Sequence, residues 1–420
     1  MTDIVETRVV RYNAHHTSIL GIDMARLPAE RRSTPPLLTA SHITAGFVAV
    51  LVGYTSSAVI IFQAASAAGA SPVQIGGWLS ALGLAMGITS IGLSLHFRQP
   101  ILTAWSTPGA ALLATSLPGL PLSEAIGIFL FSAALVVVCG VTGWFARLMQ
   151  IIPQPIAAAM LAGVLLRFGL DAFGSMETDF ILVSSMFLSY LAARRWLQRY
   201  AILLVLLVGL GVAALLGKID AAETSLILTL PQPIWPTFSL SSLIGVGIPL
   251  FVVTMASQNA PGVATLRAAG YDTPVSPLMI WTGLATLLLA PFGAFSICLA
   301  AITAAICMGP DVHPDTDRRY PAAICAGGFY LLAGLFGGSI GTLFDALPKG
   351  LVLAIAGLAL LPTIGSSLHR ALLEAHQREA ALVTFLVTGS GVTLFGVGAA
   401  FWGLVAGMST LIAASGQRRN

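Results

Sequence analysis

Residues 99–113 read QPILTAWSTPGAALL and interrupt a long apolar region of the chain. The segment 101–106 reads as a short extended piece. Ser106 or Thr107 then suits the N-cap of a helix, and Pro108 suits its first position, where no backbone N–H is needed. The helix that follows has only about half of the ~20 apolar residues that span a bilayer. A helix N-terminus is therefore expected at membrane depth.

A second interruption occurs at residues 291–300, which read PFGAFSICLA. Pro291 and Gly293 stop the preceding helix, and Ser296 can cap a new one. The two interruptions lie roughly 190 residues apart, in corresponding places of two seven-span halves. Because each half has an odd number of spans, the halves must be inverted relative to each other. Paired broken segments in an inverted repeat indicate the binding site of a transporter.

Two helix starts at membrane depth predict a site for an anion. Bare N–H groups at a helix start need partners that hydrocarbon cannot supply, and each N-terminus carries about half a positive charge. Two of them facing each other bind an anion without a basic side chain. The alternative is that both segments are kinked helices packed for shape, since Pro and Gly are common in membrane helices.

The composition places most of the chain in lipid. Of the 420 residues, 56% are hydrophobic and only 9% are charged, whereas soluble domains carry roughly 25% charged residues. Hydropathy predicts an all-α polytopic membrane protein with about fourteen spans. They are expected near 38–62, 72–95, 100–117, 122–145, 151–170, 178–192, 200–217, 240–264, 275–291, 294–309, 320–341, 347–364, 379–394 and 396–415, so that spans 3 and 10 are the half-helices.

The basic residues orient these spans. With both termini in the cytoplasm, the predicted topology leaves only Arg167, Lys218 and Lys349, out of 20 Lys and Arg residues, on the opposite side. This asymmetry follows the positive-inside rule. It also explains the net charge of +3, so the charge gives no indication of nucleic-acid binding. The inner membrane of a bacterium is the expected location.

Polar side chains also occur inside two other spans. Ser257, Gln258 and Asn259 lie in span 8, where uncompensated polarity costs several kcal/mol. We expect them to face the substrate, with hydrogen bonding between helices as the alternative. Tyr54 and Ser56 occupy the equivalent place in span 1. There the alternative for Ser56 is a hydrogen bond back to its own helix.

Catalytic and cofactor patterns are missing from the sequence. It contains no HExxH, GxSxG or P-loop pattern and no CxxC pair. We therefore predict a secondary carrier that is not an enzyme, with no cofactor and no metal. A membrane enzyme is the alternative from a different class.

Three motifs carry a resemblance to a known family: residues 101–110, residues 257–262 and the sequence Pro291-Phe292-Gly293. The chain resembles the benzoate/proton symporter family (BenE type) from about Leu37 to Ala414. That resemblance implies proton-driven uptake of benzoate, an aromatic carboxylate. The family is itself similar to the uracil-permease and sulfate-anion-transporter fold, in which fourteen spans form a 7+7 inverted repeat with core and gate domains.

The resemblance implies a division of the chain into core and gate. The expected parts are a cytoplasmic tail (1–36), the core (37–147 and 240–345), the gate (148–220 and 346–415), a periplasmic loop (221–239) and a cytoplasmic C-terminus (416–420). The candidate substrate-binding residues are Tyr54, Ser56, Ser106, Thr107, Gly109, Ser257, Gln258, Asn259, Phe295 and Ser296. Membrane lipid surrounds the protein, and a homodimer is one option for its oligomeric state.

One departure from the wider fold bears on the substrate. Nucleobase carriers place a carboxylate in span 8 and often another at the start of span 10. Here Ser257 takes the first position, and residues 292–308 contain no acid. An acid there would repel an anionic substrate, so its absence favours a carboxylate ligand. Proton coupling is left without an assigned residue, and Glu124 and Asp345 are weak candidates. A nucleobase carrier, an inorganic-anion carrier and an anion channel are the alternative functions.

Overall fold

The computed structural model describes residues 38–145, 147, 153–197, 200–219, 228–229 and 231–417. The predicted tail 1–36 lies outside these residues. The first half contains α1 (Ala40–Ala67), α2 (Pro72–Phe97), β1 (Thr103–Trp105), α3 (Thr107–Ser116), α4 (Leu122–Thr142), α6 (Gln154–Gly174), α7 (Met176–Trp196) and α8 (Ala201–Leu215). The second half contains α9 (Leu240–Ser242), α10 (Ile248–Thr254), α11 (Ala260–Ala268), α12 (Val275–Leu289), β2 (Ile297–Leu299), α13 (Ile302–Met308), α14 (Tyr320–Leu335), α15 (Gly337–Asp345), α16 (Lys349–Leu373), α17 (Arg378–Gly389) and α18 (Ala399–Gln417).

The membrane character of the fold is confirmed. Among the described residues, eight helical segments are long and apolar enough to cross a bilayer, and a ninth is the pair α14 and α15, bent by 63°. Each of the fourteen expected segments contains a helix, but several of these, such as α8, are too short to meet that criterion. The count of fourteen spans therefore stays a prediction.

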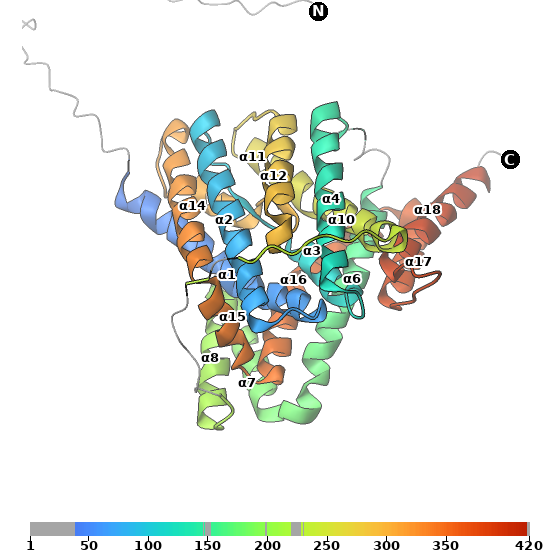
Figure 1. The fold of residues 1–420 in the computed structure, drawn as a ribbon, viewed down its shortest axis with the longest axis horizontal. Coiled ribbons are helices and arrows are strands. Elements are labelled where there is room, and N and C mark those ends of the chain that lie inside the picture. Colours follow the sequence, from blue (N-terminus) through green and yellow to red (C-terminus); the bar gives the residue numbers. More distant parts are fainter. Residues whose placement is uncertain are drawn as a thin grey trace, which may run out of the picture. The chain divides into compact units, whose positions relative to one another are not determined.

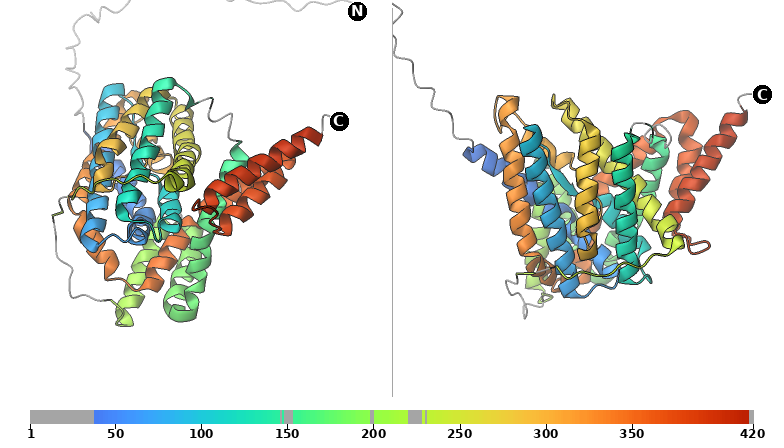
Figure 2. Two further views of the ribbon diagram at one scale, coloured as in Figure 1. Left: turned by 45° about the vertical axis from the view of Figure 1, so that its right-hand side comes forward. Right: turned by 45° about the horizontal axis from the view of Figure 1, so that its top comes forward.

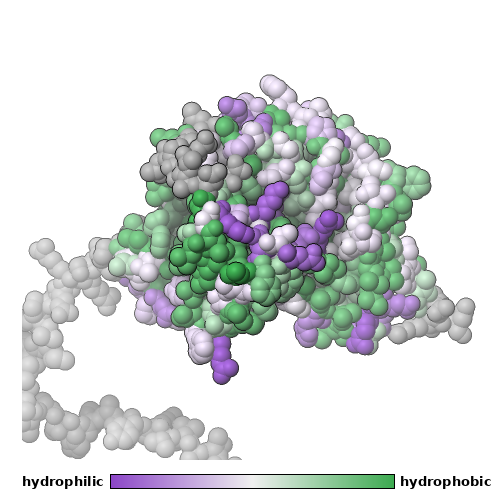
Figure 3. Space-filling model, turned by 90° about the horizontal axis from the view of Figure 1, so that it is seen from below, coloured by the Kyte–Doolittle hydropathy of each residue, from purple (hydrophilic) through white to green (hydrophobic). Residues whose placement is uncertain are grey.

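The surface of the helices matches a lipid environment. Large apolar side chains on α7 and α12, such as Leu188, Trp281 and Leu288, are more than half exposed. Figure 3 shows hydrophobic residues on both sides of a central group of hydrophilic ones. Apolar side chains that point outward have a favourable partner only in lipid or another protein.

The two interrupted segments meet in the interior as a two-stranded antiparallel sheet. β1 pairs with β2 so that Ala104 lies opposite Cys298. The ladder continues at both ends, where Ser106 N–H donates to the Ser296 carbonyl (3.0 Å) and Ala300 N–H donates to the Leu102 carbonyl (2.9 Å). Each strand thus satisfies the backbone groups that the other exposes, which is why non-helical chain can lie at this depth. The extended piece expected at 101–106 is confirmed.

The helices form two groups (Figures 1 and 2). One group joins α1 to α3 and α14, α2 to α14 and α15, and α4 to α12; the other joins α6, α7, α8, α16, α17 and α18. We refer to these groups as the core and the gate, and the division of the chain between the two domains stays a prediction. Contacts of α16 with α1 and of α6 with α3 connect the two groups.

Glycines allow α2 to pack closely on the bent pair. A Cβ on Gly83 would lie 2.6 Å from the Cα of Gly334, and one on Gly337 would lie 2.5 Å from the Gly76 carbonyl oxygen. Ser80 on α2 adds a hydrogen bond to the Gly334 carbonyl (2.5 Å). Such small-residue contacts hold membrane helices together where hydrophobic burial cannot.

Candidate functional site

The first half-helix begins as the sequence predicts. Ser106 is the N-cap of α3, and its Oγ accepts a hydrogen bond from Gly109 N–H at 3.0 Å. Thr254 donates to the same Oγ at 3.2 Å. Pro108 occupies the second helical position rather than the first, after Thr107. Since Ser106 is fully buried, its evident role is to cap α3.

Gly109 has a packing role at the same place. A Cβ on this residue would lie 2.9 Å from both Leu250 Cδ1 and Ser106 Oγ. A larger residue would therefore disturb the cap and the contact between α3 and α10.

The second half-helix begins later than expected, and the assignment of Ser296 as its cap is wrong. Ser296 precedes β2, adopts a positive φ of 41° and accepts the hydrogen bond from Ser106 N–H. The helix α13 starts at Ile302, after Ala301, and has no side-chain cap. The strand intervenes because the backbone of residues 297–299 pairs with β1 instead of entering a helix.

A cavity of about 310 Å³, here called the central cavity, lies between the two half-helix starts. Core residues on its wall are Ser56, Ser57, Trp105, Thr107, Pro108, Ser257, Gln258, Ala301, Ile302, Thr303 and Tyr330. The gate contributes Leu161, Thr363, Ser366 and Arg370. The cavity therefore lies where core and gate meet.

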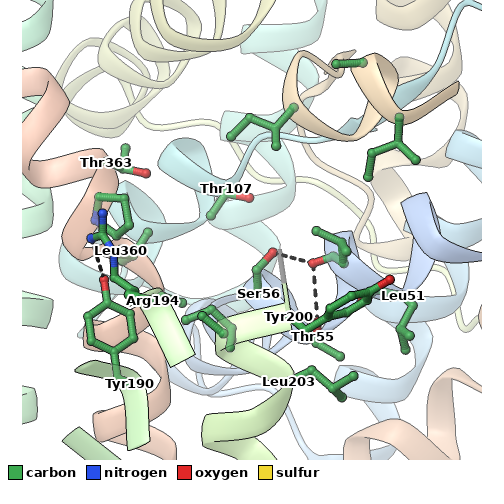
Figure 4. A pocket seen from close by; sticks show the side chains of 18 of the residues that line it. Leu51, Thr55, Ser56, Thr107, Tyr190, Arg194, Tyr200, Leu203, Leu360 and Thr363 are labelled. Carbon is green, nitrogen blue, oxygen red and sulfur yellow. Dashed lines mark hydrogen bonds between the residues drawn. The ribbon is translucent and has the colours of Figure 1, made fainter. Parts of the chain in front are cut away.

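A larger cavity of about 710 Å³, here called the vestibule, adjoins the central cavity. The two share Ser56, Thr107 and Gln258. The vestibule extends to Tyr190 and to Arg194, whose Nη1 donates to the Tyr190 hydroxyl at 3.0 Å (Figure 4). It leads from the central cavity toward the C-terminal end of α7 and the start of α8.

The adjacent amides of span 8 have different surroundings. Asn259 is fully buried, accepts a hydrogen bond from Leu299 N–H at 2.9 Å and donates to Met255 Sδ at 3.2 Å. Its amide therefore holds β2 against span 8, which does not support a direct role in binding substrate. Gln258, by contrast, lines both the central cavity and the vestibule.

The backbone of span 8 explains this divergence. Residues Met255–Asn259 form a π-helical turn, and Pro261, which cannot donate to the helix, follows after one intervening residue. Such turns widen the helix and often mark functional sites. Ser257 also lies in the turn and lines the central cavity.

The serine hydroxyls that span 1 contributes already make hydrogen bonds. Ser56 donates to the Val52 carbonyl at 2.7 Å, as the sequence-based alternative holds, yet it lines the central cavity. Ser57 accepts a hydrogen bond from Trp105 Nε1 at 2.8 Å. Tyr54 packs edge-on against Trp105, with 4.8 Å between ring centroids, and its buried hydroxyl has no partner in the described structure. Tyr54 thus lies behind Trp105 and supports it.

Phe295 does not face the central cavity. It is fully buried and packs near Phe129 and Trp78, with ring centroids 5.6 and 6.2 Å away. The aromatic residues that line the cavity are Trp105 and Tyr330, which the sequence analysis did not select.

The sequence analysis also missed three residues of the gate. The helix α16 is apolar over residues 350–361, and polar side chains begin directly after Pro362. Among them are Thr363, Ser366 and Arg370, which are spaced by three and four residues. That spacing places them on one helix face. This spacing is the sequence pattern that could have predicted a polar wall of the site on the gate.

No acidic or histidine side chain lines either cavity in the described part of the chain. Glu124 accepts a hydrogen bond from Ser242 at the start of α4, and the side chain of Asp345 lies outside the described residues. Nor do the described residues include a group of three His, Cys, Asp or Glu side chains that could hold a metal ion. The formal charges at the cavities are those of Arg194 and Arg370.

Interrupted helices that cross in an apolar protein and enclose a polar cavity define a membrane transporter with core and gate domains. Residues 37–413 match the sequence profile of the family described as "Benzoate membrane transport protein", and the chain belongs to this family. Its function class is membrane transport.

Two relatives cover almost the same region. The chain is 55% identical over 365 residues to "Inner membrane protein YdcO" of Escherichia coli, which covers 87% of this chain and 93% of that protein. It is 43% identical over 368 residues to the "Benzoate membrane transport protein" of Acinetobacter baylyi, which covers 88% of this chain and 93% of that one.

Solved structures share the fold at low identity. The structure of SLC26A9 aligns with a TM-score of 0.60 and 14% identity, covering 89% of this chain and 65% of that chain. The transmembrane domain of the cyanobacterial bicarbonate transporter BicA aligns with a TM-score of 0.56 and 11% identity, covering 89% and 96%. These likenesses establish the fold alone.

Proposed function

We propose that the protein is a secondary carrier that imports benzoate, or a similar aromatic carboxylate, together with protons across the bacterial inner membrane. The central cavity is the observation that carries this proposal. It combines an apolar and aromatic wall, several polar side chains and the absence of acidic residues among the described ones. The similarity to a relative named as a benzoate transport protein supports the choice of substrate.

The two parts of an aromatic carboxylate suit two parts of the cavity wall. Trp105, Tyr330 and Ile302 offer apolar and aromatic surface to the ring. Gln258 and Thr107 offer hydrogen-bond donors to the carboxylate. At about 310 Å³, the cavity lies at the lower end of the range for small-molecule sites, which fits a single-ring ligand.

Orientation follows from the basic residues. Loops at one end of the helix bundle carry Arg98, Arg318, Arg319 and Arg378, and we place this end and both termini in the cytoplasm. Arg194, which lines the vestibule, lies in the last turn of α7, and we place it on the same side of the membrane. The central cavity then opens inward, the state from which an imported substrate leaves.

Among the described residues, no acidic or histidine side chain lines the cavities to carry the coupled proton. We propose that the substrate's own carboxylate takes up the proton during translocation. Benzoic acid has a pKa near that of a side-chain carboxyl, about 4. Burial raises the pKa of a carboxyl by as much as about 3–5, so a closed, dry site favours the neutral acid.

Binding and uptake by purified protein test the function. Calorimetry should show binding of benzoate but not of uracil or sulfate. Proteoliposomes should accumulate benzoate above its equilibrium level when a proton gradient is imposed. Preference for uracil or an inorganic anion would support the alternative carriers, and equilibration without accumulation would indicate an anion channel.

A further inference from the structure

The gate helix α16 presents a polar stripe, defined as Thr363, Ser366 and Arg370, to the central cavity. All three residues line that cavity, and their spacing of three and four residues keeps them on one face. Pro362 directly precedes the stripe and lies inside the helix, where it removes one backbone hydrogen bond. The stripe begins at Thr363, which lines the cavity together with the half-helix starts. It ends at Arg370, in the last turn of α16.

Arg370 lines two spaces at once. Besides the central cavity, it lines a groove of about 510 Å³, whose wall includes Gln154 on α6 and Ala268 on α11. Ser257 and Pro261 also belong to both linings. Arg370 thus lies where the central cavity continues into a second opening. This opening is distinct from the vestibule, which extends to Arg194.

The guanidinium of Arg370 has no counter-charge among the described residues. Within the described structure it makes no hydrogen bond or ion pair, whereas Arg194 donates to Tyr190 and Arg319 donates to three backbone carbonyls. No Asp or Glu lines the central cavity or the groove in the part of the chain that is described. A positive charge left unpaired beside an acid-free cavity is suited to an anion.

We propose that Arg370 forms a second carboxylate station at the cytoplasmic mouth of the central cavity. The proposal rests on the proposed function and adds a gate residue to it. The guanidinium pairs with the carboxylate as the substrate leaves the core residues Gln258 and Thr107. Arginine suits this role because its planar donors match the two oxygens of a carboxylate.

The station predicts an effect that depends on the side of the membrane. Arg370 belongs to the gate, whereas Gln258 and Thr107 belong to the core. When core and gate move relative to each other, the core residues stay with the substrate but Arg370 does not. Loss of Arg370 should therefore weaken binding from the cytoplasmic side and leave binding from the opposite side unchanged.

The test compares Arg370→Gln and Arg370→Lys with a matched control, Arg378→Gln. Arg378 is an exposed arginine at the start of α17 that lines none of these cavities. Half-saturating benzoate concentrations are measured from each side in proteoliposomes of known orientation, and benzamide serves as the uncharged competitor. Size-exclusion profiles and thermal stability establish that each variant is folded.

For Arg370→Gln we expect a half-saturating benzoate concentration about tenfold higher from the cytoplasmic side only, since a hydrogen bond to a charged group is worth that much. Arg370→Lys should show a smaller increase in this concentration than Arg370→Gln. Competition by benzamide should not change in either variant. Equal effects on both sides, equal effects on benzamide, or wild-type values would overturn the proposal.

Failure of the proposed function gives a different result. If the wild-type protein transports an inorganic anion in place of benzoate, the proposed function is wrong, and the same variants are then measured with that anion. A one-sided loss would still support the station. An equal loss on both sides, or none, would overturn it.

Discussion

The two half-helix starts occupy matched places in the repeat but differ in their chemistry. At the start of α3, Pro108 has no N–H and Gly109 N–H is bound by Ser106. At the start of α13, Ile302 and Thr303 line the central cavity, and in the described structure their N–H groups make no hydrogen bond. The side chain of Ser106 thus binds one N–H group of the first start, where the Thr107 N–H has no partner in the described structure, and the second start has no side-chain cap at all.

The difference revises the simple picture of two opposed helix dipoles. α13 has only seven residues, so its dipole is small, and its contribution to a ligand is that of individual N–H donors. α3 is anchored by its cap and by the pairing of β1 with β2. A symmetric repeat can therefore divide its tasks, with one break fixing the geometry and the other offering donors.

The most severe disruption of this arrangement should come from Gly293→Ala. Gly293 has φ of +96°, and a Cβ there would lie 1.9 Å from Trp78 Cδ1. Backbone strain of about 1–3 kcal/mol and overpacking of about 1–3 kcal/mol should both act. We expect little folded protein, measured as the yield of the monodisperse species. Gly391→Ala, at φ +68° with open space around it, isolates the strain; equal losses in the two variants would show that Trp78 is not the obstacle.

Span 8 allows binding and structure to be separated at neighbouring residues. Gln258→Ala should weaken benzoate binding about tenfold or more, because a hydrogen bond to a charged ligand is worth about 1.5–3 kcal/mol, with thermal stability unchanged. Asn259→Ala should instead lower thermal stability, because Leu299 N–H loses its buried partner. Calorimetry and thermal unfolding measure the two effects. The reverse pattern would mean that Asn259, not Gln258, binds the substrate.

A smaller effect is expected from the cap of the first half-helix. Ser106→Ala should cost about 0.5–2 kcal/mol of stability, the range for loss of an N-cap. Because Gly109 N–H would lose its acceptor, substrate could bind there instead and partly offset the loss. Thermal unfolding with and without benzoate measures both. As a control, Ser185→Ala removes a hydroxyl that lines neither cavity and only donates to the Leu182 carbonyl of its own helix; if it were equally destabilising, the cap would have no special role.

The sequence was sufficient for the first break and insufficient for the second. For the first break the cap was predicted as Ser106 or Thr107, because residues of capping type stand directly before Pro108, and the structure selects Ser106. α13 begins after Ala301, which has no side chain able to cap, and Ser296 is a capping type that instead precedes a strand. The sequence cannot show that residues 297–299 pair with a strand almost two hundred residues away. Local patterns therefore predict local starts, and pairing between distant segments decides the rest.

The candidate site shows the same division. Gln258 was found because polarity in an apolar segment is costly, and Thr107 because it stands at the start of the first half-helix; the structure places both on the central cavity. Asn259 gave the same signal, but its cost is met by Leu299. Phe295 was selected for its nearness to the break, yet it packs against Phe129. Only the fold determines which side of a segment faces the cavity.

The smallest expected effect concerns the acids, and it tests whether the substrate carries the proton. Glu124, Asp171, Asp272 and Asp311 line neither the central cavity nor the vestibule, and Asp345 completes the set of candidates. Each is replaced by its amide, one at a time, and benzoate accumulation is measured in proteoliposomes with an imposed proton gradient. We expect all five variants to concentrate benzoate as the wild type does.

This null result has a physical reason. A relay through a fixed acid requires that acid to reach the substrate path, and Glu124 instead accepts a hydrogen bond from Ser242, while Asp171 pairs with Arg167 at the exposed surface. A carboxylate that travels with the substrate needs no such path, because entry into a dry site raises its own pKa. Counterflow exchange without a proton gradient serves as the control for folded, active protein. An amide variant that still exchanges benzoate but no longer concentrates it would identify that acid as the coupling residue and exclude a proton carried by the substrate alone.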